Sequence, residues 1–244
     1  MSPPLPRLDP QLVLRAYAMG VFPMADHRDA ANVYWVEPKL RGIMPLEGFH
    51  LSRSLRKTIN SDRFRVTADT AFADIIALCA ESADDRPDTW INPSIERVFG
   101  ELHDAGLAHS VECWLDGELV GGLYGLALGR AFFGESMVSR ARDASKVAMA
   151  WLVARLKVGG FTLLDCQFQT DHLASLGAIE IPRDDYVALL SAAVGDGVVS
   201  GSGADGASSG ADFGALDRLL DDESDEIVSP PSGKRISQLL GHTS

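Results

Sequence analysis

Hydrophobic and polar residues recur along this chain with two different periods, and these periods separate predicted helices from predicted strands. Apolar residues recur at helical spacing in residues 10–19, 71–80 and 144–158. Asn92 followed by Pro93 supplies the cap and the first position of a further helix, which runs to about residue 105. The pattern therefore predicts four helices.

Strand-like segments occupy the intervals between these helices. They lie around Phe64 and at residues 110–115, 119–128, 131–139 and 162–168. The Asp116-Gly117 pair is a hairpin signal between two of them. The last segment is short and almost entirely apolar, which is typical of a buried central strand. We expect an α/β (α+β) fold with a mixed sheet.

Composition changes near both ends of the chain. An extended Y-W-V segment around Trp35 predicts a small N-terminal domain over residues 1–45, ahead of a main domain at residues 46–194. From about residue 195, a linker-like G-S-G-A-D-G-A-S-S-G is followed by the acidic run D-D-E-S-D-E. We expect residues 195–244 to form a flexible, disordered and dispensable acidic tail, because few large apolar groups are present.

Overall composition places few limits on function. Hydrophobic residues make up 46% and charged residues 23% of the 244, which are ordinary globular values. No apolar run approaches the ~18 residues that a membrane span needs, and the N-terminus lacks the apolar core of a signal peptide. The three cysteines show no C-x-x-C pattern. We expect a cytoplasmic protein with no membrane contact, no metal and no cofactor.

Charge is distributed unevenly along the chain. The net charge is −12, of which residues 191–244 contribute −6 through nine acids and three bases. Residues 39–65 carry +5, from two acids and seven bases, which are Lys39, Arg41, Arg53, Arg56, Lys57, Arg63 and Arg65. A bound phosphate backbone responds to this local field. Both a solvated helix face and a phosphate-binding surface fit the segment S-R-S-L-R-K.

A polar pair interrupts the last apolar strand. Asp165 and Gln167 flank Cys166, so on a strand their side chains share one face. Buried polar groups lose stability unless they are hydrogen-bonded. The pair therefore belongs either to a structural network or to a catalytic site.

This pair lies in an ordered set of motifs. They read G-G-L-Y-G-L-A-L-G-R, F-F-G-E-S-M-V-S, A-S-K-V-A-M-A-W-L-V and L-L-D-C-Q-F-Q-T-D-H-L-A-S-L-G-A-x-E-I-P-R. From about Pro10 to about Leu190 the chain resembles the leucyl/phenylalanyl-tRNA–protein transferases. The resemblance implies transfer of Leu or Phe, with Met as a further candidate, from aminoacyl-tRNA to proteins with N-terminal Lys or Arg, which marks them for N-degron degradation. We expect the protein to be a monomer.

The resemblance also implies roles for individual residues. Asp165 and Gln167 match the family's catalytic pair. Glu135 is either a surface strand residue or, because it lies on a glycine-rich strand that we expect to face Asp165, a contact for an ammonium group. An apolar pocket for the donor side chain is expected from Leu123, Met137, Ser139, Leu152, Leu156 and Leu164, although core packing also explains the apolar members. Contacts to tRNA are expected from Trp90, Met24, Arg53, Arg56 and Lys57; other members carry tryptophan at the position of Met24. His172 is expected to be structural.

The reaction makes a modest chemical demand. An aminoacyl ester is already activated, and an α-amine with a pKa of about 7.7–8.0 is partly neutral at physiological pH. Gln167 is a very weak base, so we expect it to hold the amine or the ester by hydrogen bonds. Asp165 then either orients Gln167 or accepts the proton through it or through a water.

Other functional classes remain open. From Phe64 onward the predicted element order matches the N-acetyltransferase-like (GNAT) architecture, which by itself gives no function. An acyl-CoA-dependent N-acetyltransferase is one alternative, yet the segment S-R-A-R-D-A-S-K lacks the glycines of a pyrophosphate loop. The others are an aminoacyl-tRNA-dependent transferase with a different acceptor, and an inactive tRNA-binding module.

Overall fold

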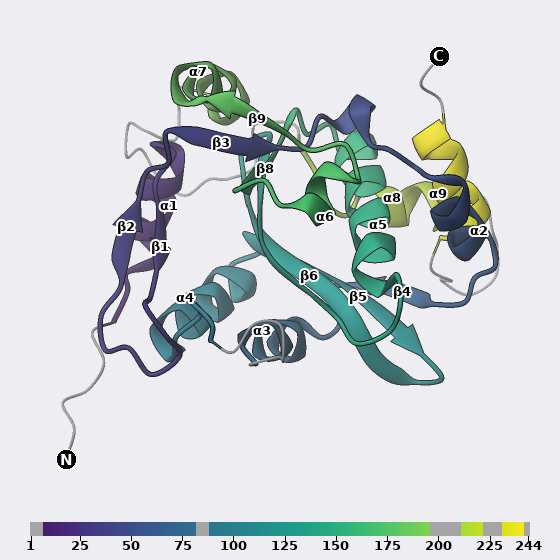
Figure 1. The fold of residues 1–244 in the computed structure, drawn as a ribbon, viewed down its shortest axis with the longest axis horizontal. Coiled ribbons are helices and arrows are strands. Elements are labelled where there is room, and N and C mark those ends of the chain that lie inside the picture. Colours follow the sequence, from purple (N-terminus) through teal and green to yellow (C-terminus); the bar gives the residue numbers. More distant parts are fainter. Residues whose placement is uncertain (1–6, 82–87, 196–210, 222–230, 242–244) are drawn as a thin grey trace.

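A computed structural model describes residues 7–81, 88–195, 211–221 and 231–241 of the chain. Its centre is a seven-stranded sheet in the order β4-β5-β6-β7-β8-β3-β9 (Figure 1). Strands β7 and β8 run parallel, and the other neighbouring pairs run antiparallel. A separate two-stranded sheet pairs β1 with β2. The fold is therefore a mixed α/β fold, as expected.

The strands of the large sheet are β3 (Leu40–Ile43), β4 (Arg65–Ala68), β5 (Ala108–Leu115), β6 (Glu118–Leu128), β7 (Ala131–Ser139), β8 (Leu163–Gln167) and β9 (Ile179–Pro182). The pattern predicted β4 to β8 and did not predict β3 and β9. The small sheet consists of β1 (Phe22–Met24) and β2 (Tyr34–Val36). At the β5–β6 hairpin both turn residues, Asp116 and Gly117, have positive φ, which confirms the predicted tight turn.

Helices cover both faces of the sheet. They are α1 (Pro10–Ala18), α2 (Arg53–Asn60), α3 (Phe72–Ala80), α4 (Pro93–Asp104), α5 (Ala144–Val158), α6 (Asp171–Ala174), α7 (Arg183–Val194), α8 (Ala215–Asp221) and α9 (Gly233–Gly241), with a short 3-10 helix, η1, at Leu46–Gly48. The Asn92 side chain accepts hydrogen bonds from two backbone N–H groups at the start of α4. This contact confirms the predicted cap. Among the described residues no helix has the length and apolar character to span a membrane.

Alternate residues of the central strands enter two different cores. Phe132 and Leu164 pack with α5 on one face of the sheet, and their neighbours Phe133 and Leu163 pack with α1, α3, α4 and α7 on the other. This alternation follows from the two-residue period of a strand. Because β3 lies inside the large sheet and α1 shares a core with α3 and α4, the N-terminal segment packs directly on the main sheet. The predicted boundary at residue 45 stays a prediction.

The C-terminal segment differs from the expectation of a disordered tail. Helices α8 and α9 pack against α5, and α9 also packs against α2 (Figure 1). The described part of the tail contributes four buried apolar side chains, from Phe213, Leu216, Ile236 and Leu240. The expectation was therefore wrong for residues 211–221 and 231–241, and the rest of the acidic linker lies outside the described residues.

Helix α5 explains why these C-terminal helices dock. Twelve of its fifteen residues are buried, so it has no broad solvent-facing side. One side packs on β5, β6 and β7, and the other is covered by α2, α8 and α9. A helix that is apolar all round requires such cover on every side. The C-terminal helices supply the cover that the sheet cannot.

Candidate functional site

The carboxylate of Asp165 is fully buried and fully paired. Arg41 on β3 donates to it through Nε at 2.9 and 3.1 Å and through Nη2 at 2.6 Å. The Tyr186 hydroxyl on α7 donates at 2.6 Å, and the backbone N–H of Gln167 donates at 2.8 Å. Burial, reinforced by the Asp165 charge, raises the pKa of Tyr186, so this hydroxyl keeps its proton. The Asp165 carboxylate therefore connects β8 to β3 and α7.

Gln167 has an unusual backbone conformation, which this anchor supports. Its φ is +55°, in the left-handed region that residues with a side chain rarely adopt. Gly42 on β3 pairs with it, and a Cβ at Gly42 would lie 2.7 Å from the carbonyl carbon of Phe168. The close approach of β3 and the bond to Asp165 together hold the turn that ends β8.

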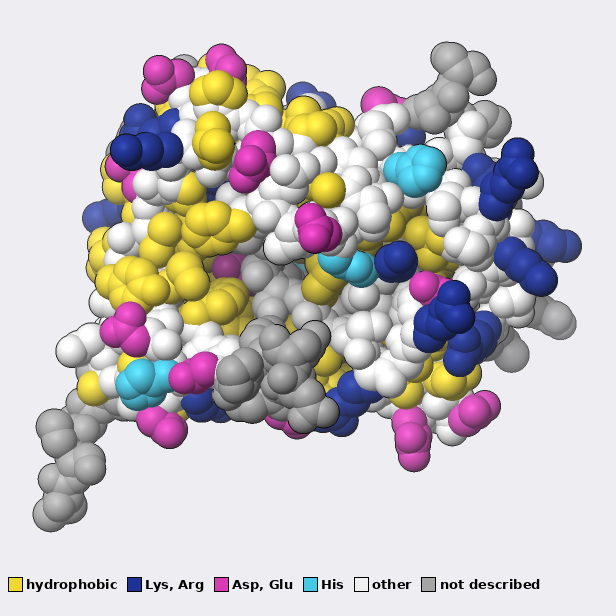
Figure 2. All heavy atoms as spheres, in the orientation of Figure 1, with side chains coloured by type: hydrophobic (Ala, Val, Ile, Leu, Met, Phe, Trp, Pro, Cys, Tyr) yellow, Lys and Arg dark blue, Asp and Glu magenta, His cyan; other side chains and the backbone are white. Residues whose placement is uncertain are grey.

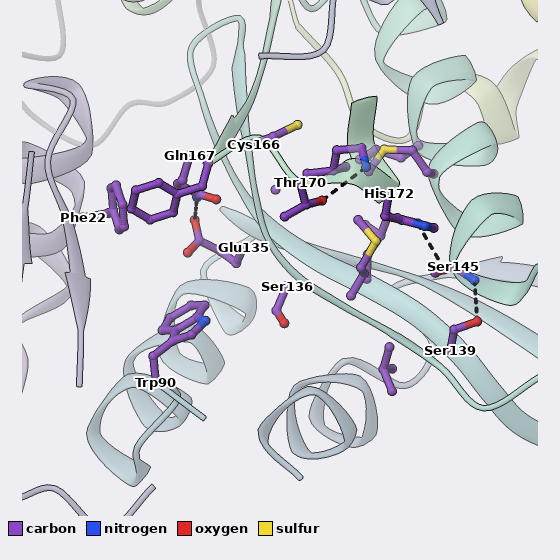
Figure 3. A pocket seen from close by; sticks show the side chains of 18 of the residues that line it. Phe22, Trp90, Glu135, Ser136, Ser139, Ser145, Cys166, Gln167, Thr170 and His172 are labelled. Carbon is purple, nitrogen blue, oxygen red and sulfur yellow. Dashed lines mark hydrogen bonds between the residues drawn. The ribbon is translucent and has the colours of Figure 1, made fainter. Parts of the chain in front are cut away.

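The Gln167 side chain is oriented by a second contact. Its Nε2 donates to Glu135 Oε1 on β7 at 3.0 Å, as Figure 3 shows. No described residue donates a hydrogen bond to the Gln167 Oε1 atom. Gln167 lines a cavity, so this oxygen is the side chain's remaining acceptor for a ligand.

Glu135 is buried beside the Asp165 and Gln167 pair. Burial, followed by the charge of Asp165, raises the pKa of Glu135 to about 8, although contacts with Tyr17, Arg41 and Gln167 favour its charged form. Tyr17 is buried below it, and burial together with the Glu135 charge raises the pKa of Tyr17. The arrangement leaves Glu135 ready to charge when a cation enters the cavity.

The cavity has a volume of about 580 Å³ and is largely apolar. In Figure 3, Phe22 and Trp90 lie toward one end, Gln167 and Glu135 lie beside them, and Ser139, Ser145 and His172 lie toward the other. The remaining lining side chains include Met24, Leu123, Met137, Met149, Leu152, Cys166, Phe168 and Leu173. Space for an apolar group therefore adjoins a polar pair.

The structure brings together most, but not all, of the predicted site residues. Eight of them line the cavity: Met24, Trp90, Leu123, Glu135, Met137, Ser139, Leu152 and Gln167. Asp165 lies behind the wall, and Leu156 and Leu164 are buried in the α5 core without lining the cavity. These two leucines therefore pack in the core, which was the alternative to a place in the donor pocket.

The predicted basic residues fall into separate groups. Arg53, Arg56 and Lys57 lie on the exposed side of α2, away from the cavity lining. Arg41 is 1% exposed and neutralised by Asp165, so it cannot belong to an exposed basic surface. The local charge of +5 counted in the sequence therefore overstates the charge that a ligand would meet.

Several residues of the site were missed in the sequence. Arg41 and Tyr186 hold Asp165, and Phe22 packs edge-on against Phe168 at the cavity wall. His172, expected to be structural, is half-buried in the lining, and burial, then the charge of Lys146, lowers its pKa. A basic residue in the apolar strand L-R-G-I was the available signal for Arg41.

Ser139 supports the site by binding the start of helix α5. Its Oγ donates to the carbonyl of Ala141 at 2.9 Å and accepts from the backbone N–H of Ser145 at 3.3 Å. Asp143, at the cap position, makes no such side-chain bond. Ser139 therefore satisfies an N–H at the start of α5, which carries Ser145, Met149 and Leu152 into the cavity wall.

Comparisons with family models and with known proteins agree on one family. The model described as "Leucyl/phenylalanyl-tRNA protein transferase" matches residues 43–191, and that of the family's N-terminal domain matches residues 7–39. The proteins named leucyl/phenylalanyl-tRNA–protein transferase from Rhizorhabdus wittichii and Novosphingobium aromaticivorans are 63% and 48% identical, over 97% of this chain and 99% and 97% of their own. The one from Zymomonas mobilis is 66% identical over 77% of this chain and 70% of its own.

A solved structure of FemX aligns with a TM-score of 0.46 and 12% identity, over 68% of this chain and 65% of its own. The matches to the family models and to the relatives include the residues that line the cavity. The chain belongs to the leucyl/phenylalanyl-tRNA protein transferase family.

Proposed function

We propose that this protein transfers an amino acid from aminoacyl-tRNA to the α-amino group of a protein. The observation that carries the proposal is the Gln167–Glu135 pair in the wall of a largely apolar cavity. An aminoacyl ester combines an apolar side chain, an ammonium group and an electrophilic carbonyl. The cavity offers apolar side chains to the first and the Glu135 carboxylate to the second, and Gln167 lies beside Glu135, where it can position the amine that attacks the third.

The donor amino acid occupies the apolar part of the cavity. Leu123, Met137, Met149 and Leu152 surround its side chain, and the methionines adapt to either a branched or an aromatic group. Glu135 receives the α-ammonium group and becomes charged as it does so. The donor is Leu or Phe, with Met as a further candidate.

Gln167 positions the attacking amine. Glu135 holds its Nε2, so Oε1 can accept a hydrogen bond from the neutral α-amine of the acceptor. The amine nitrogen then forms a bond to the ester carbonyl carbon, and the carbon–oxygen bond to the tRNA ribose breaks. The amine loses a proton and the ribose oxygen gains one. Holding the reactants in this geometry supplies on the order of 7–11 kcal/mol in favourable cases.

Asp165 acts as a positioning residue in this scheme. Three donors besides the Gln167 backbone N–H bond saturate its carboxylate: Arg41 Nε, Arg41 Nη2 and the Tyr186 hydroxyl. These bonds hold the carboxylate behind the cavity wall, and Asp165 is not among the lining residues. Of the two roles expected for Asp165, orientation of Gln167 therefore fits the geometry better.

The remaining features of the proposal rest on the family resemblance. Trp90 lies toward the opposite end of the cavity from Ser139 (Figure 3), and Met24 is also in the lining; both contact the terminal adenosine of the tRNA, Trp90 by stacking. Acceptors carry N-terminal Lys or Arg. The sheet corresponds to a GNAT-like transferase domain, and the protein works as a cytoplasmic monomer in N-degron degradation.

A transfer assay tests the proposal. The full chain is incubated either with a pool of charged tRNAs or with acetyl-CoA. The acceptors are peptides that differ only in the N-terminal residue or, separately, a non-peptide amine, and the mass of each acceptor is measured. We expect a gain of Leu or Phe on peptides with N-terminal Lys or Arg, and none from acetyl-CoA. A mass gain from acetyl-CoA alone would favour an N-acetyltransferase instead, and transfer to a non-peptide amine would favour a different acceptor class.

The same assay with the Gln167→Ala variant tests the role of Gln167. We expect single-turnover transfer to fall by about 100-fold, because the amine loses its acceptor. Gln169→Ala is the matched control, since its side chain donates to the Ala178 carbonyl at 2.7 Å and does not line the cavity. Equal transfer rates in the Gln167 and Gln169 variants would refute the assigned role of Gln167.

A further inference from the structure

A surface of five bases spans the neighbouring helices α2 and α9. Arg53, Arg56 and Lys57 are exposed on α2, and on α9 Lys234 is exposed and Arg235 partly exposed. Neither helix contains an acidic residue. Figure 2 shows dark blue side chains gathered where Figure 1 places α2 and α9, on the face viewed there. These five residues are called the α2–α9 basic surface.

The charges on α2 are uncompensated within the described part of the chain. Arg53, Arg56 and Lys57, with Asn60 and Ser61, line an open hollow, and no described carboxylate forms an ion pair with these three bases. Only Leu55 and Ile59 of this helix are buried. Its charged side therefore faces solvent, where a phosphate backbone can reach it.

Helix α9 is fixed on α2 by specific contacts. The backbone N–H of Gly233 donates to Asp62 Oδ1 at 2.7 Å, and Ser237 Oγ donates to Asn60 Oδ1 at 2.6 Å. A Cβ at Gly233 would lie 1.9 Å from the Ile59 carbonyl oxygen, so only glycine permits this approach. One oxygen of the Asp62 carboxylate is thereby bound by the first residue of α9.

The docked helix also orients a base of α2. Arg56 Nη1 donates to the Ser237 carbonyl at 3.4 Å, and the Arg56 guanidinium lies near Gly241 at the end of α9. Gly233, Ile236, Ser237 and Leu240 face inward. The helical period therefore turns Lys234 outward. Docking of α9 both adds positive charge and steers the charge already present on α2.

We propose that α9 is part of the RNA-binding surface, and that its bases and those of α2 together contact the phosphate backbone of the tRNA donor. This inference rests on the proposed function, which supplies a polyanionic substrate. It concerns a segment beyond residue 191, where the family model ends, although the relatives from Rhizorhabdus wittichii and Novosphingobium aromaticivorans align over 97% of the chain. The acidic C-terminal region thus contributes a basic helix to binding.

The first test neutralises the bases of α9. Binding of uncharged tRNA to the full chain carrying Lys234→Gln and Arg235→Gln is measured by fluorescence anisotropy over a range of salt concentrations. We expect the slope of log affinity against log salt to fall by about 1–2 in magnitude. Arg15→Gln with Arg97→Gln is the matched control, since both are exposed on α1 and α4. A slope that stays at the wild-type value in the α9 variant would overturn the proposal.

A second variant keeps every charge and changes only the docking. Gly233→Val places a side chain against the Ile59 carbonyl and should displace α9, which hydrogen exchange of its amides detects. Displacement together with a reduced salt slope supports the proposal. Displacement with an unchanged slope overturns it, because the position of the charges would then not matter.

The transfer assay separates this inference from the proposed function. The Lys234→Gln/Arg235→Gln variant should raise KM for charged tRNA several-fold and leave kcat unchanged, because these residues lie outside the cavity lining. If the wild-type protein transfers no amino acid yet shows the salt slope expected here, the proposed function fails and RNA binding by α9 stands. If it transfers normally and both slopes are equal, only the present inference fails.

Discussion

Two buried arginines of this protein are paired with aspartates in very different surroundings. The Arg41 and Asp165 side chains are 1% and 0% exposed, and both come from the large sheet. The Arg155 side chain on α5 is 3% exposed, whereas its partner Asp217 on α8 is 45% exposed. One pair is thus sealed inside the main fold, and the other joins that fold to its C-terminal segment.

The difference bears on what each pair does. Asp165 also receives the Gln167 backbone N–H and the Tyr186 hydroxyl, so the sealed pair fixes the conformation of the candidate site. Arg155 donates to both carboxylate oxygens of Asp217 and to the Phe213 carbonyl, all from the C-terminal segment. Breaking the first should damage stability and site together, and breaking the second should release the C-terminal helices.

Arg41→Met should have the largest effect of the substitutions considered. It leaves the Asp165 carboxylate buried without its cation, which costs about 3–5 kcal/mol of unfolding free energy. Urea unfolding measures the loss. Arg183→Met, which removes an ion pair with Glu37 whose side chains are 45% and 49% exposed, is the control and should cost about 0–1 kcal/mol. Equal losses in the two variants would show that Asp165 is rehydrated.

Asp217→Ala should cost less, roughly 1–3 kcal/mol, because water can reach part of the exposed site and replace the carboxylate. Chemical unfolding again measures the loss. The double variant Arg155→Met/Asp217→Leu removes both charges and should lose less stability than Asp217→Ala alone. A larger loss in the double variant would mean that Arg155 stabilises the core through its packing on Phe213 more than through its charge.

Glu135→Gln should change the pH dependence of stability. In the folded protein the pKa of Glu135 is raised to about 8 from an ordinary value of 4.5. Between these two pH values the folded protein keeps a proton on Glu135 that the unfolded chain releases. The wild-type unfolding free energy should therefore fall as pH rises from about 4.5 toward about 8, by up to about 1.4 kcal/mol per pH unit from this residue. The variant should lack this component, and Glu101→Gln, on the surface, should retain it. Parallel pH profiles for all three proteins would contradict the shifted pKa.

The sequence predicted those parts of the fold that are determined locally. Helix α5 has the predicted bounds of residues 144 and 158, and the Asn92 cap and the Asp116-Gly117 turn are as expected. Each depends on side chains within a few positions of one another. The Arg41–Asp165 pair joins residues 124 positions apart, so no local pattern could reveal it.

The C-terminal helices were missed for a different reason. The C-terminal segment combines a basic amphipathic helix with an acidic linker, so its overall composition resembles that of a disordered tail. The signal was present elsewhere, in helix α5, whose apolar residues are not confined to the side that faces the sheet. An apolar side that the sheet cannot cover predicts a further covering element. Candidate site residues on β7 and β8 were found because their polar pattern interrupts apolar strands.

Ser237→Ala should give the smallest effect and would set a lower limit on how firmly the C-terminal segment is held. The Ser237 hydroxyl is buried and donates to Asn60 Oδ1, but Asn60 itself is exposed and water can replace the lost donor. We expect a loss of about 0.5–1.5 kcal/mol, typical of one neutral hydrogen bond. Gln238→Ala, on the exposed side of α9, should lie within about 0.5 kcal/mol of wild type. A loss in Ser237→Ala as large as that in Asp217→Ala would mean that α9, rather than the Arg155 pair, holds the C-terminal segment to the main fold.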